Sequence, residues 1–238
     1  KTRENIFGRL KNLITGKSIS EKTVDEIEEI LISSDIGGTD PDDNQSMIHF
    51  LMYSNMFNTE GLISSPSYGH GSKQVILDMI DLYEKDFQKL EQHSKDYPSP
   101  VYLRSICKQG RQGGAPYYGV TSGTEGSDWI IKCAEKKSEQ PLWVLVWGGL
   151  DDLAQALHDA PDIQNKIKVY WIGGPNKKWS VNAYAYIAGN HPDLWMIEAN
   201  ATSPSMQIVG IFCTPSFTMK PTPSRVVILC SCTCTDTS

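Results

Sequence analysis

Apolar residues along this chain fall into two alternating kinds of segment. Segments typical of strands begin at about residue 30 and recur at residues 60–65, 142–147, 167–172 and 194–198. Residues 142–147 are a continuous apolar run, as expected of a strand buried on both faces. Apolar residues spaced three or four apart, typical of helices with one buried face, occur at residues 44–53, 75–90, 129–134, 150–157 and 179–188. Strands that alternate with helices predict an α/β fold with a doubly wound, mostly parallel sheet.

The two ends of the chain depart from this alternation. Residues 1–29 carry two short amphipathic repeats, which predict a helical N-terminal segment. Residues 203–238 are rich in Ser, Thr and Pro and contain few charges, which predicts an irregular tail. We therefore expect one α/β domain over residues 30–202, in which residues 93–126 are mostly loop.

Composition and charge narrow the classes of partner. The formal net charge is −6 and no basic stripe is present, so no nucleic-acid partner is expected. No apolar run approaches the roughly 20 residues of a membrane-spanning helix, so no membrane partner is expected either. Three cysteines near the C-terminus alternate as C-x-C-x-C, unlike the C-x-x-C spacing of common zinc and redox sites.

Acidic residues are concentrated directly after the first expected strand. Asp35, Asp40, Asp42 and Asp43 lie within nine residues, interrupted by glycines that permit a tight turn. The carboxyl ends of parallel strands form the usual ligand-binding edge of an open α/β sheet. Carboxylates that converge there favour a hard cation, Ca²⁺ or Mg²⁺, over zinc. The alternative is a solvated acidic turn that caps the following helix.

Four segments carry a specific resemblance to a known family. Residues 35–43 read DIGGTDPDD, residues 145–157 read LVWGGLDDLAQAL, residues 172–174 read IGG and residues 198–200 read EAN. Together they resemble the inosine–uridine nucleoside hydrolase superfamily, and most closely its branch of nucleoside hydrolase-like proteins described as cellulose-binding proteins of unknown function. The resemblance implies hydrolysis of a ribosyl N-glycosidic bond by a Ca²⁺-activated water.

The resemblance also implies roles for the acidic residues. Asp35, Asp42 and Asp43 match the family's metal-binding aspartates, and Asp151 falls where the family supplies a main-chain carbonyl to the metal. The general base is Asp40 or Asp35, because the spacing of the motif differs from the family pattern by one residue.

The resemblance places the substrate around a second set of side chains. Glu198 and Asn200 match residues that bind sugar hydroxyls, and Asp42 is expected to contact the sugar as well. His70 lies in the glycine-rich loop after the second expected strand, where it could contact the ligand. The expected partner is thus a small nucleoside or carbohydrate, with a homo-oligomer as one open alternative.

A second resemblance covers residues 1–37, which are similar to the N domain of the bacterial signal recognition particle receptor. The phosphate loop of that GTPase is absent from the sequence, so GTP hydrolysis is not expected. Hydrolase relatives suggest an exported or periplasmic protein, whereas this N-terminal segment suggests a cytoplasmic one.

The nucleoside hydrolase-like pattern stops after about residue 202, where the family would supply a further metal-binding aspartate. We therefore expect an incomplete metal site, consistent with a shifted reading frame in the tail. Three hypotheses remain open: a Ca²⁺-dependent N-glycoside hydrolase, a non-catalytic carbohydrate-binding module on the same fold, and a fragment of a targeting protein related to the signal recognition particle receptor.

Overall fold

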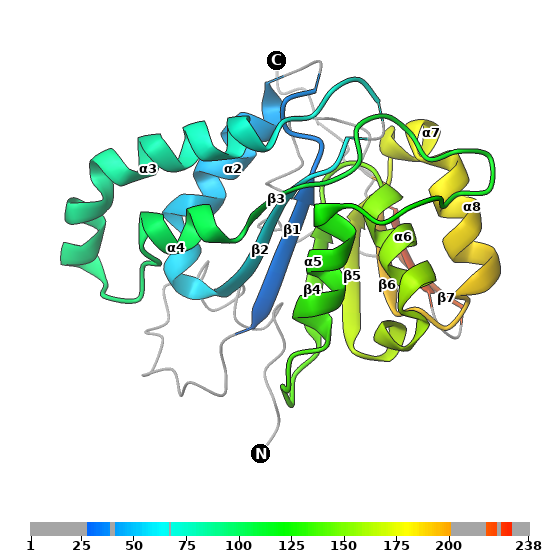
Figure 1. Cartoon of the computed structure of the whole chain (residues 1–238). Helices are drawn as coiled ribbons and strands as arrows, with labels where there is room; N and C mark the ends of the chain where they lie inside the picture. The colour runs from blue at the N-terminus through cyan, green and yellow to red at the C-terminus, as the bar shows by residue number, and fades with distance from the viewer. Residues whose placement is uncertain (1–27, 39–40, 67, 201–217, 223–224, 230–238) are drawn as a thin grey trace, which may run out of the picture.

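The computed structural model describes residues 28–38, 41–66, 68–200, 218–222 and 225–229 (Figure 1). An eight-stranded sheet with strand order β3-β2-β1-β4-β5-β6-β8-β7 runs through the centre of the described residues. The strands are β1 (Glu29–Ser34), β2 (Asn58–Ser64), β3 (Cys107–Gln109), β4 (Leu142–Val146), β5 (Ile167–Ile172), β6 (Met196–Ala199), β7 (Thr218–Thr222) and β8 (Arg225–Leu229).

Strand pairing is parallel everywhere except between β7 and β8. The chain builds the sheet outward in one direction from β1 to β3, and in the other direction from β4 to β6. The strand order therefore reverses between β1 and β4. In open α/β sheets the carboxyl ends of the two strands at such a reversal flank the usual ligand crevice.

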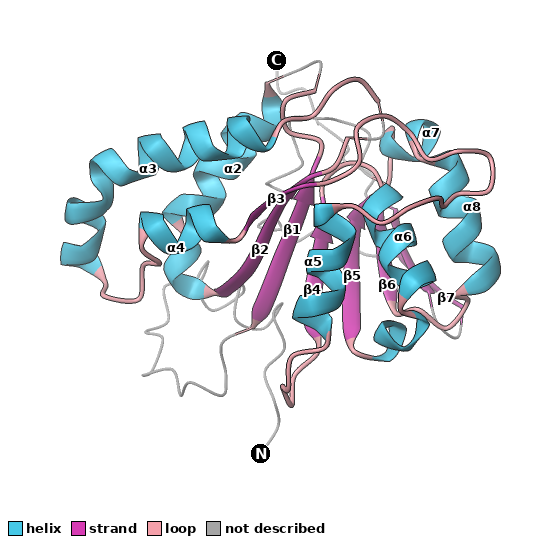
Figure 2. Cartoon of the chain, in the orientation of Figure 1, coloured by secondary structure: helices cyan, strands magenta, loops and turns pink. Residues whose placement is uncertain are grey.

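Helices cover both faces of the sheet, which confirms the doubly wound architecture (Figure 2). One face carries α2 (Asp42–Met52), α3 (Lys73–His93) and α4 (Pro100–Ser105), whose apolar side chains form one core cluster with residues such as Ile32. The other face carries α5 (Glu125–Ala134), α6 (Asp151–Asp159) and α8 (Val181–Asn190), which form a second cluster with residues such as Leu31. Short helical segments complete the fold: η2 (Ser54–Met56), η3 (Pro161–Asn165) and α7 (Asn176–Trp179).

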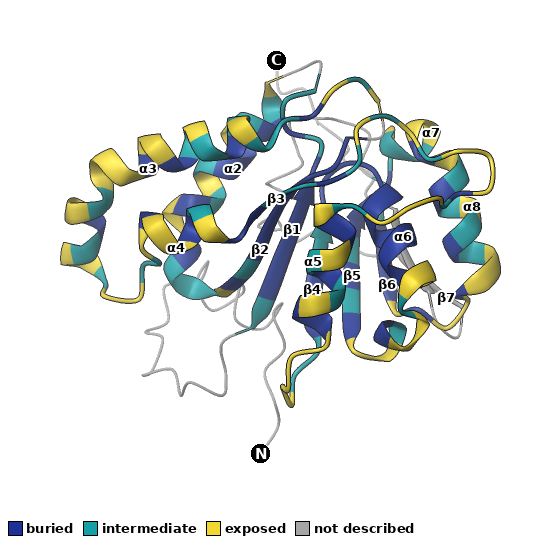
Figure 3. Ribbon diagram, in the orientation of Figure 1, coloured by how far each residue is buried: buried dark blue, intermediate teal, exposed yellow. Residues whose placement is uncertain are grey.

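The alternation of side chains along each strand explains these two clusters. Leu31 and Ile32 are adjacent in β1 and fully buried, but they belong to opposite clusters because successive side chains of a strand point to opposite faces. The central strands are accordingly buried along most of their length (Figure 3). This burial on both faces is why β4 is a continuous apolar run in the sequence.

The expected strands and helices are present, with two corrections. Residues 93–126 were expected to be mostly loop, but they contain the helix α4 and the edge strand β3. The described parts of the expected irregular tail form β7 and β8, which extend the sheet beyond β6. The helices expected over residues 1–27 lie outside the described residues. Within the described part of the chain, no helix is long and apolar enough to cross a bilayer.

Candidate functional site

The first acidic residue lies at the point where the strand order reverses. Asp35 directly follows β1, and Gly148 follows the neighbouring strand β4. A Cβ atom added to Gly148 would lie 2.6 Å from both Cβ and Cγ of Asp35. The two turns are therefore in close contact, and the turn after β4 needs a glycine so that the Asp35 side chain can occupy this position.

The paired aspartates open helix α2 beside this turn. Asp43 is buried, and its Oδ2 atom accepts a 3.0 Å hydrogen bond from the Ser34 hydroxyl. The same hydroxyl oxygen accepts a hydrogen bond from the main-chain N–H of Ile36, which fixes the chain as it leaves β1. The Oδ1 atom of Asp42 accepts from the main-chain N–H of Asp43. Three carboxylates are thus gathered at one end of the central strand.

Burial and crowding change the acidity of Asp43. The pKa of this carboxyl lies well above its usual range. The largest cause is its removal from water, and the next is the neighbouring carboxyls of Asp35 and Asp42. The hydrogen bond from Ser34 opposes this rise but does not cancel it. An added proton or a bound cation would relieve the same repulsion, so the site is receptive to positive charge.

Buried polar atoms without a hydrogen-bond partner gather near the same edge of the sheet. Within the described part of the chain four such side-chain atoms occur: Asp43 Oδ1, Ser65 Oγ, Trp147 Nε1 and Thr59 Oγ1. The first three lie at or just beyond the carboxyl ends of β1, β2 and β4. Buried polar atoms are nearly always paired in folded proteins, so unpaired ones call for a ligand, water or ion.

Asp151, whose main-chain carbonyl is the group expected at the metal, has a carboxylate that is engaged in hydrogen bonds. Its Oδ1 atom accepts a 2.5 Å hydrogen bond from the main-chain N–H of Ala115, and its Oδ2 atom accepts one from the Ser180 hydroxyl. Ala115 belongs to the long loop 110–124, whereas Ser180 precedes α8. The Asp151 carboxylate therefore joins two segments of the second face.

The neighbouring side chains of α6 hold the same loop. Asp152, which is fully buried, accepts hydrogen bonds from the main-chain N–H of Arg111 and from the hydroxyl of Thr124. One turn later Gln155 accepts from the main-chain N–H of Thr121. Both ends of the loop are thus attached to the first turns of α6, which explains why polar residues occupy buried positions on that helix.

The expected sugar-binding pair lies at the end of β6. Glu198 is buried and forms an ion pair with Lys177, accepts a hydrogen bond from the Tyr184 hydroxyl and accepts a 3.0 Å hydrogen bond from Asn200 Nδ2. Burial lowers the pKa of Lys177, but the contacts with Glu198 outweigh this and raise it overall. Glu198 and Asn200 therefore lie together, with partners that the motif did not identify.

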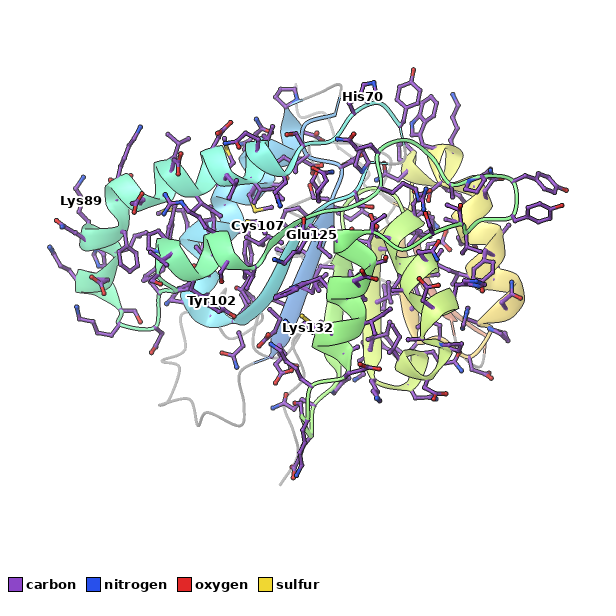
Figure 4. The ribbon with its side chains drawn as sticks, viewed as in Figure 1. His70, Lys89, Tyr102, Cys107, Glu125 and Lys132 are labelled. Carbon is purple, nitrogen blue, oxygen red and sulfur yellow. The ribbon has the colours of Figure 1, made fainter. Side chains whose placement is uncertain are left out.

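The loop after β2 reaches across the carboxyl edge. His70 is exposed in this loop, at the end of the sheet away from Tyr102 and Lys132 (Figure 4). In the same loop Tyr68 stacks on Trp179 of α7, with 4.3 Å between ring centroids. Since α7 follows β5, this contact spans the ends of β1 and β4, where the acidic turn lies.

The site contains residues that the sequence analysis did not identify, and one expected residue is not described. Ser34 donates a hydrogen bond to Asp43, Ser65 has an unpaired hydroxyl, and Lys177 forms an ion pair with Glu198. Only the position of the two serines at strand ends gives a signal in the sequence. Asp40, the expected general base, lies outside the described residues.

The acidic turn suits a metal ion because of the type of ligand atoms that it offers. Asp35, Asp42 and Asp43 supply only hard oxygen donors, and Asp43 Oδ1 is buried without a partner, which suits Ca²⁺ or Mg²⁺. Over the described ranges, however, no group of three or more His, Cys, Asp or Glu side chains is arranged to hold a metal. A cation here would therefore need further oxygen ligands from main chain, water or substrate.

Comparison with known proteins places this arrangement in a family. A search of curated proteins finds no match. Among solved structures, a nucleoside hydrolase-related hypothetical protein from Saccharophagus degradans, associated with carbohydrate metabolism, aligns with a TM-score of 0.65 and 25% identity over 79% of this chain. The alignment covers 51% of that protein, so this chain spans about half its length.

An inosine–uridine preferring nucleoside hydrolase from Bacillus anthracis aligns at 19% identity and a TM-score of 0.47, over 73% of this chain and 64% of that enzyme. The family model that matches starts at residue 29 and gives no support to the resemblance of residues 1–37 to the signal recognition particle receptor. That model, described as the cellulose-binding Sde182, nucleoside hydrolase-like domain, matches residues 29–222, and the chain therefore belongs to this family.

Proposed function

We propose that this domain binds a nucleoside or related glycoside at the carboxyl edge of the sheet and hydrolyses its N-glycosidic bond with the help of Ca²⁺. The observation that carries the proposal is the set of unpaired buried polar atoms, Asp43 Oδ1, Ser65 Oγ and Trp147 Nε1, beside the reversal of strand order. A polar ligand with a cation would supply partners for these atoms.

The acidic residues would hold the cation and move a proton. Asp35, Asp42 and Asp43 would coordinate Ca²⁺, which when bound lowers the pKa of a neighbouring water. A carboxylate of Asp35 would accept the proton of that water as it attacks the anomeric carbon, with Asp40 as the alternative base. The C–N bond to the leaving group would break in the same step, and the leaving nitrogen would take a proton from solvent. Negative charge at this edge would also stabilise the oxocarbenium-like transition state.

The far side of the site would hold the sugar. Glu198 and Asn200 would bind ribose hydroxyls, with Lys177 and Tyr184 fixing the orientation of the Glu198 carboxylate. Asp35 follows β1 and Asn200 follows β6, so three inter-strand spacings, roughly 14 Å of main chain, separate them. A ligand that contacts both must therefore be extended, as a nucleoside or a disaccharide is.

A second candidate is a carbohydrate-binding module without catalysis. The buried carboxylate of Glu198 already has three partners, and the described residues lack a three-ligand metal cluster. The description of the matching family as cellulose-binding also favours this reading.

Turnover of a chromogenic ribosyl glycoside by the full chain separates the two candidates. We expect hydrolysis in millimolar CaCl₂, loss of activity with EDTA, and at least about a 100-fold lower rate in Asp43→Asn. The control is Asp162→Asn, an exposed carboxylate in η3, which should leave the rate unchanged. Activity that survives both chelation and Asp43→Asn would overturn the Ca²⁺ mechanism, whereas sugar binding without turnover that is lost in Glu198→Gln would establish the second candidate.

A further inference from the structure

A concave site lies at the opposite edge of the sheet from the acidic turn. It has a volume of about 820 Å³, within the range of small-molecule pockets. Residues at or just before the starts of β1, β4, β5 and β6 line it, together with the end of α5 and the loop that joins α5 to β4: Glu29, Leu142, Ile167, Trp195 and residues 133–141. We call it the amino-edge pocket, because parallel strands begin there.

An exposed tryptophan forms part of its wall. Trp195 is 37% exposed although it directly precedes β6. Its ring meets the buried ring of Trp143 edge to face, with 5.4 Å between centroids, and the Lys168 ammonium lies 5.4 Å from the centroid of each ring. The indole is thus held in one orientation by a buried partner while part of its surface remains open to a ligand.

The rest of the lining is polar but balanced in charge. Four acidic and four basic side chains line the pocket: Glu29, Glu135, Glu139, Asp193, Lys136, Lys137, Lys166 and Lys168. The amide side chain of Asn165 also lines the pocket, as do Ser138, which donates a hydrogen bond to Glu29, and Gln164, whose Oε1 pairs with His191. A lining with many donors and acceptors and no net charge gives no electrostatic preference for an anion or a cation. It suits a neutral ligand rich in hydroxyl groups.

We propose that the amino-edge pocket binds a neutral oligosaccharide chain, with one sugar ring against the open surface of Trp195 and its hydroxyls on the surrounding charged and amide groups. Sugar rings have apolar C–H faces and polar edges, which match an aromatic surface bordered by hydrogen-bonding side chains. This site is independent of the acidic turn, because the two lie at opposite ends of the same parallel strands.

Affinity electrophoresis of the full chain through hydroxyethylcellulose, followed by calorimetry with cellohexaose, tests the proposal. We expect wild type to be retarded, Trp195→Ala to bind at least about tenfold more weakly, and Trp195→Phe to retain most of the affinity. Trp195→Leu keeps apolar volume against Trp143 and should lose binding as well, which covers the case in which Trp195→Ala does not fold.

Two controls connect any loss of binding to this pocket. Trp179→Ala removes an exposed tryptophan at the carboxyl edge and should leave cellohexaose binding unchanged. Addition of EDTA should do the same, so failure of the proposed Ca²⁺-dependent hydrolase would leave this result intact. Binding should also persist in 0.5 M NaCl, because a neutral ligand is little affected by screening. The proposal is overturned if wild type shows no retardation, if folded Trp195→Ala and Trp195→Leu bind like wild type, or if Trp179→Ala abolishes binding.

Discussion

Two helices of this domain begin with the same pair of aspartates at the carboxyl edge of the sheet, but the two pairs have different environments. Asp151 and Asp152 open α6, and both carboxylates are buried against main-chain N–H groups and hydroxyls. Asp42 and Asp43 open α2, where Asp43 is buried with one oxygen unpaired and with a raised pKa. The first pair fixes a loop, whereas the second leaves one buried oxygen of Asp43 without a hydrogen-bond partner.

The difference shows that burial and sequence pattern alone do not identify a reactive carboxylate. A buried aspartate surrounded by donors contributes to stability, because each donor would otherwise lose its partner. A buried aspartate beside other carboxylates is destabilising until a proton or a cation joins it. Such strain is expected at functional sites and is compensated elsewhere in the fold.

The largest expected effect is on stability, at α6. Asp152→Ala removes the acceptor for the Arg111 N–H and the Thr124 hydroxyl in a buried site, and we expect the free energy of unfolding to fall by roughly 3–5 kcal/mol. Urea unfolding measures this, with the exposed Asp162→Ala as the control. A loss below about 1 kcal/mol would show that the loop is not held by this carboxylate.

A smaller loss is expected where the two turns meet. Gly148→Ala would place a Cβ atom against Asp35 and should lower the free energy of unfolding by roughly 1–3 kcal/mol, since the Asp35 main-chain nitrogen is also only 2.8 Å away. The matched control is Gly189→Ala in α8, where an added Cβ meets nothing within 4 Å. That variant should be neutral or slightly stabilising, by up to about 1 kcal/mol. Equal effects of the two variants would contradict the close contact.

Asp43 at the start of α2 should make the free energy of unfolding depend on pH. The pKa of Asp43 is raised in the folded state, so the folded protein binds a proton here more tightly than the unfolded chain does. The resulting stabilisation is fully present below about pH 4 and is lost as the pH rises through the folded-state pKa. In EDTA, Asp43→Asn should therefore become progressively more stable relative to wild type between pH 4 and pH 7. Urea unfolding at several pH values measures the difference, and a constant difference would count against the raised pKa.

The smallest effect is expected at the tip of the loop that α6 holds. Tyr117 is 87% exposed, and its ring packs edge-on against that of Tyr118. Tyr117→Ser should change the free energy of unfolding by no more than about 0.5 kcal/mol, because the loop is attached at its base. Thermal unfolding of Tyr117→Ser and of Asp152→Ala, measured in parallel, compares the loss of stability at the tip of the loop with the loss at its base.

The sequence predicts the fold where strands are buried on both faces. Residues 142–147 form a continuous apolar run, and β4 occupies most of it. The edge strand β3 was missed because it has only three residues, Cys107–Gln109, and little apolar surface to bury. Helix α4 was missed although Ser99 caps it and Pro100 opens it, because six residues carry too little periodicity.

The candidate site was predictable only in part. The position of Asp35 after the first strand follows from local pattern, and so does the position of Glu198 on the last expected strand. The partners of Asp151 do not, because its carboxylate binds a main-chain N–H that lies 36 residues earlier in the chain. The ion pair of Glu198 with Lys177 likewise depends on how two βα units sit side by side.

The most direct test of the central claim is the effect of Ca²⁺ on the thermal unfolding of the full chain. A cation that binds the native state raises the melting temperature by mass action. We predict a rise in millimolar CaCl₂ for wild type and for Asp162→Asn, reversed by EDTA, and no rise for Asp43→Asn. A wild-type melting temperature that does not respond to Ca²⁺, or an equal rise in Asp43→Asn, would contradict a cation site at the acidic turn.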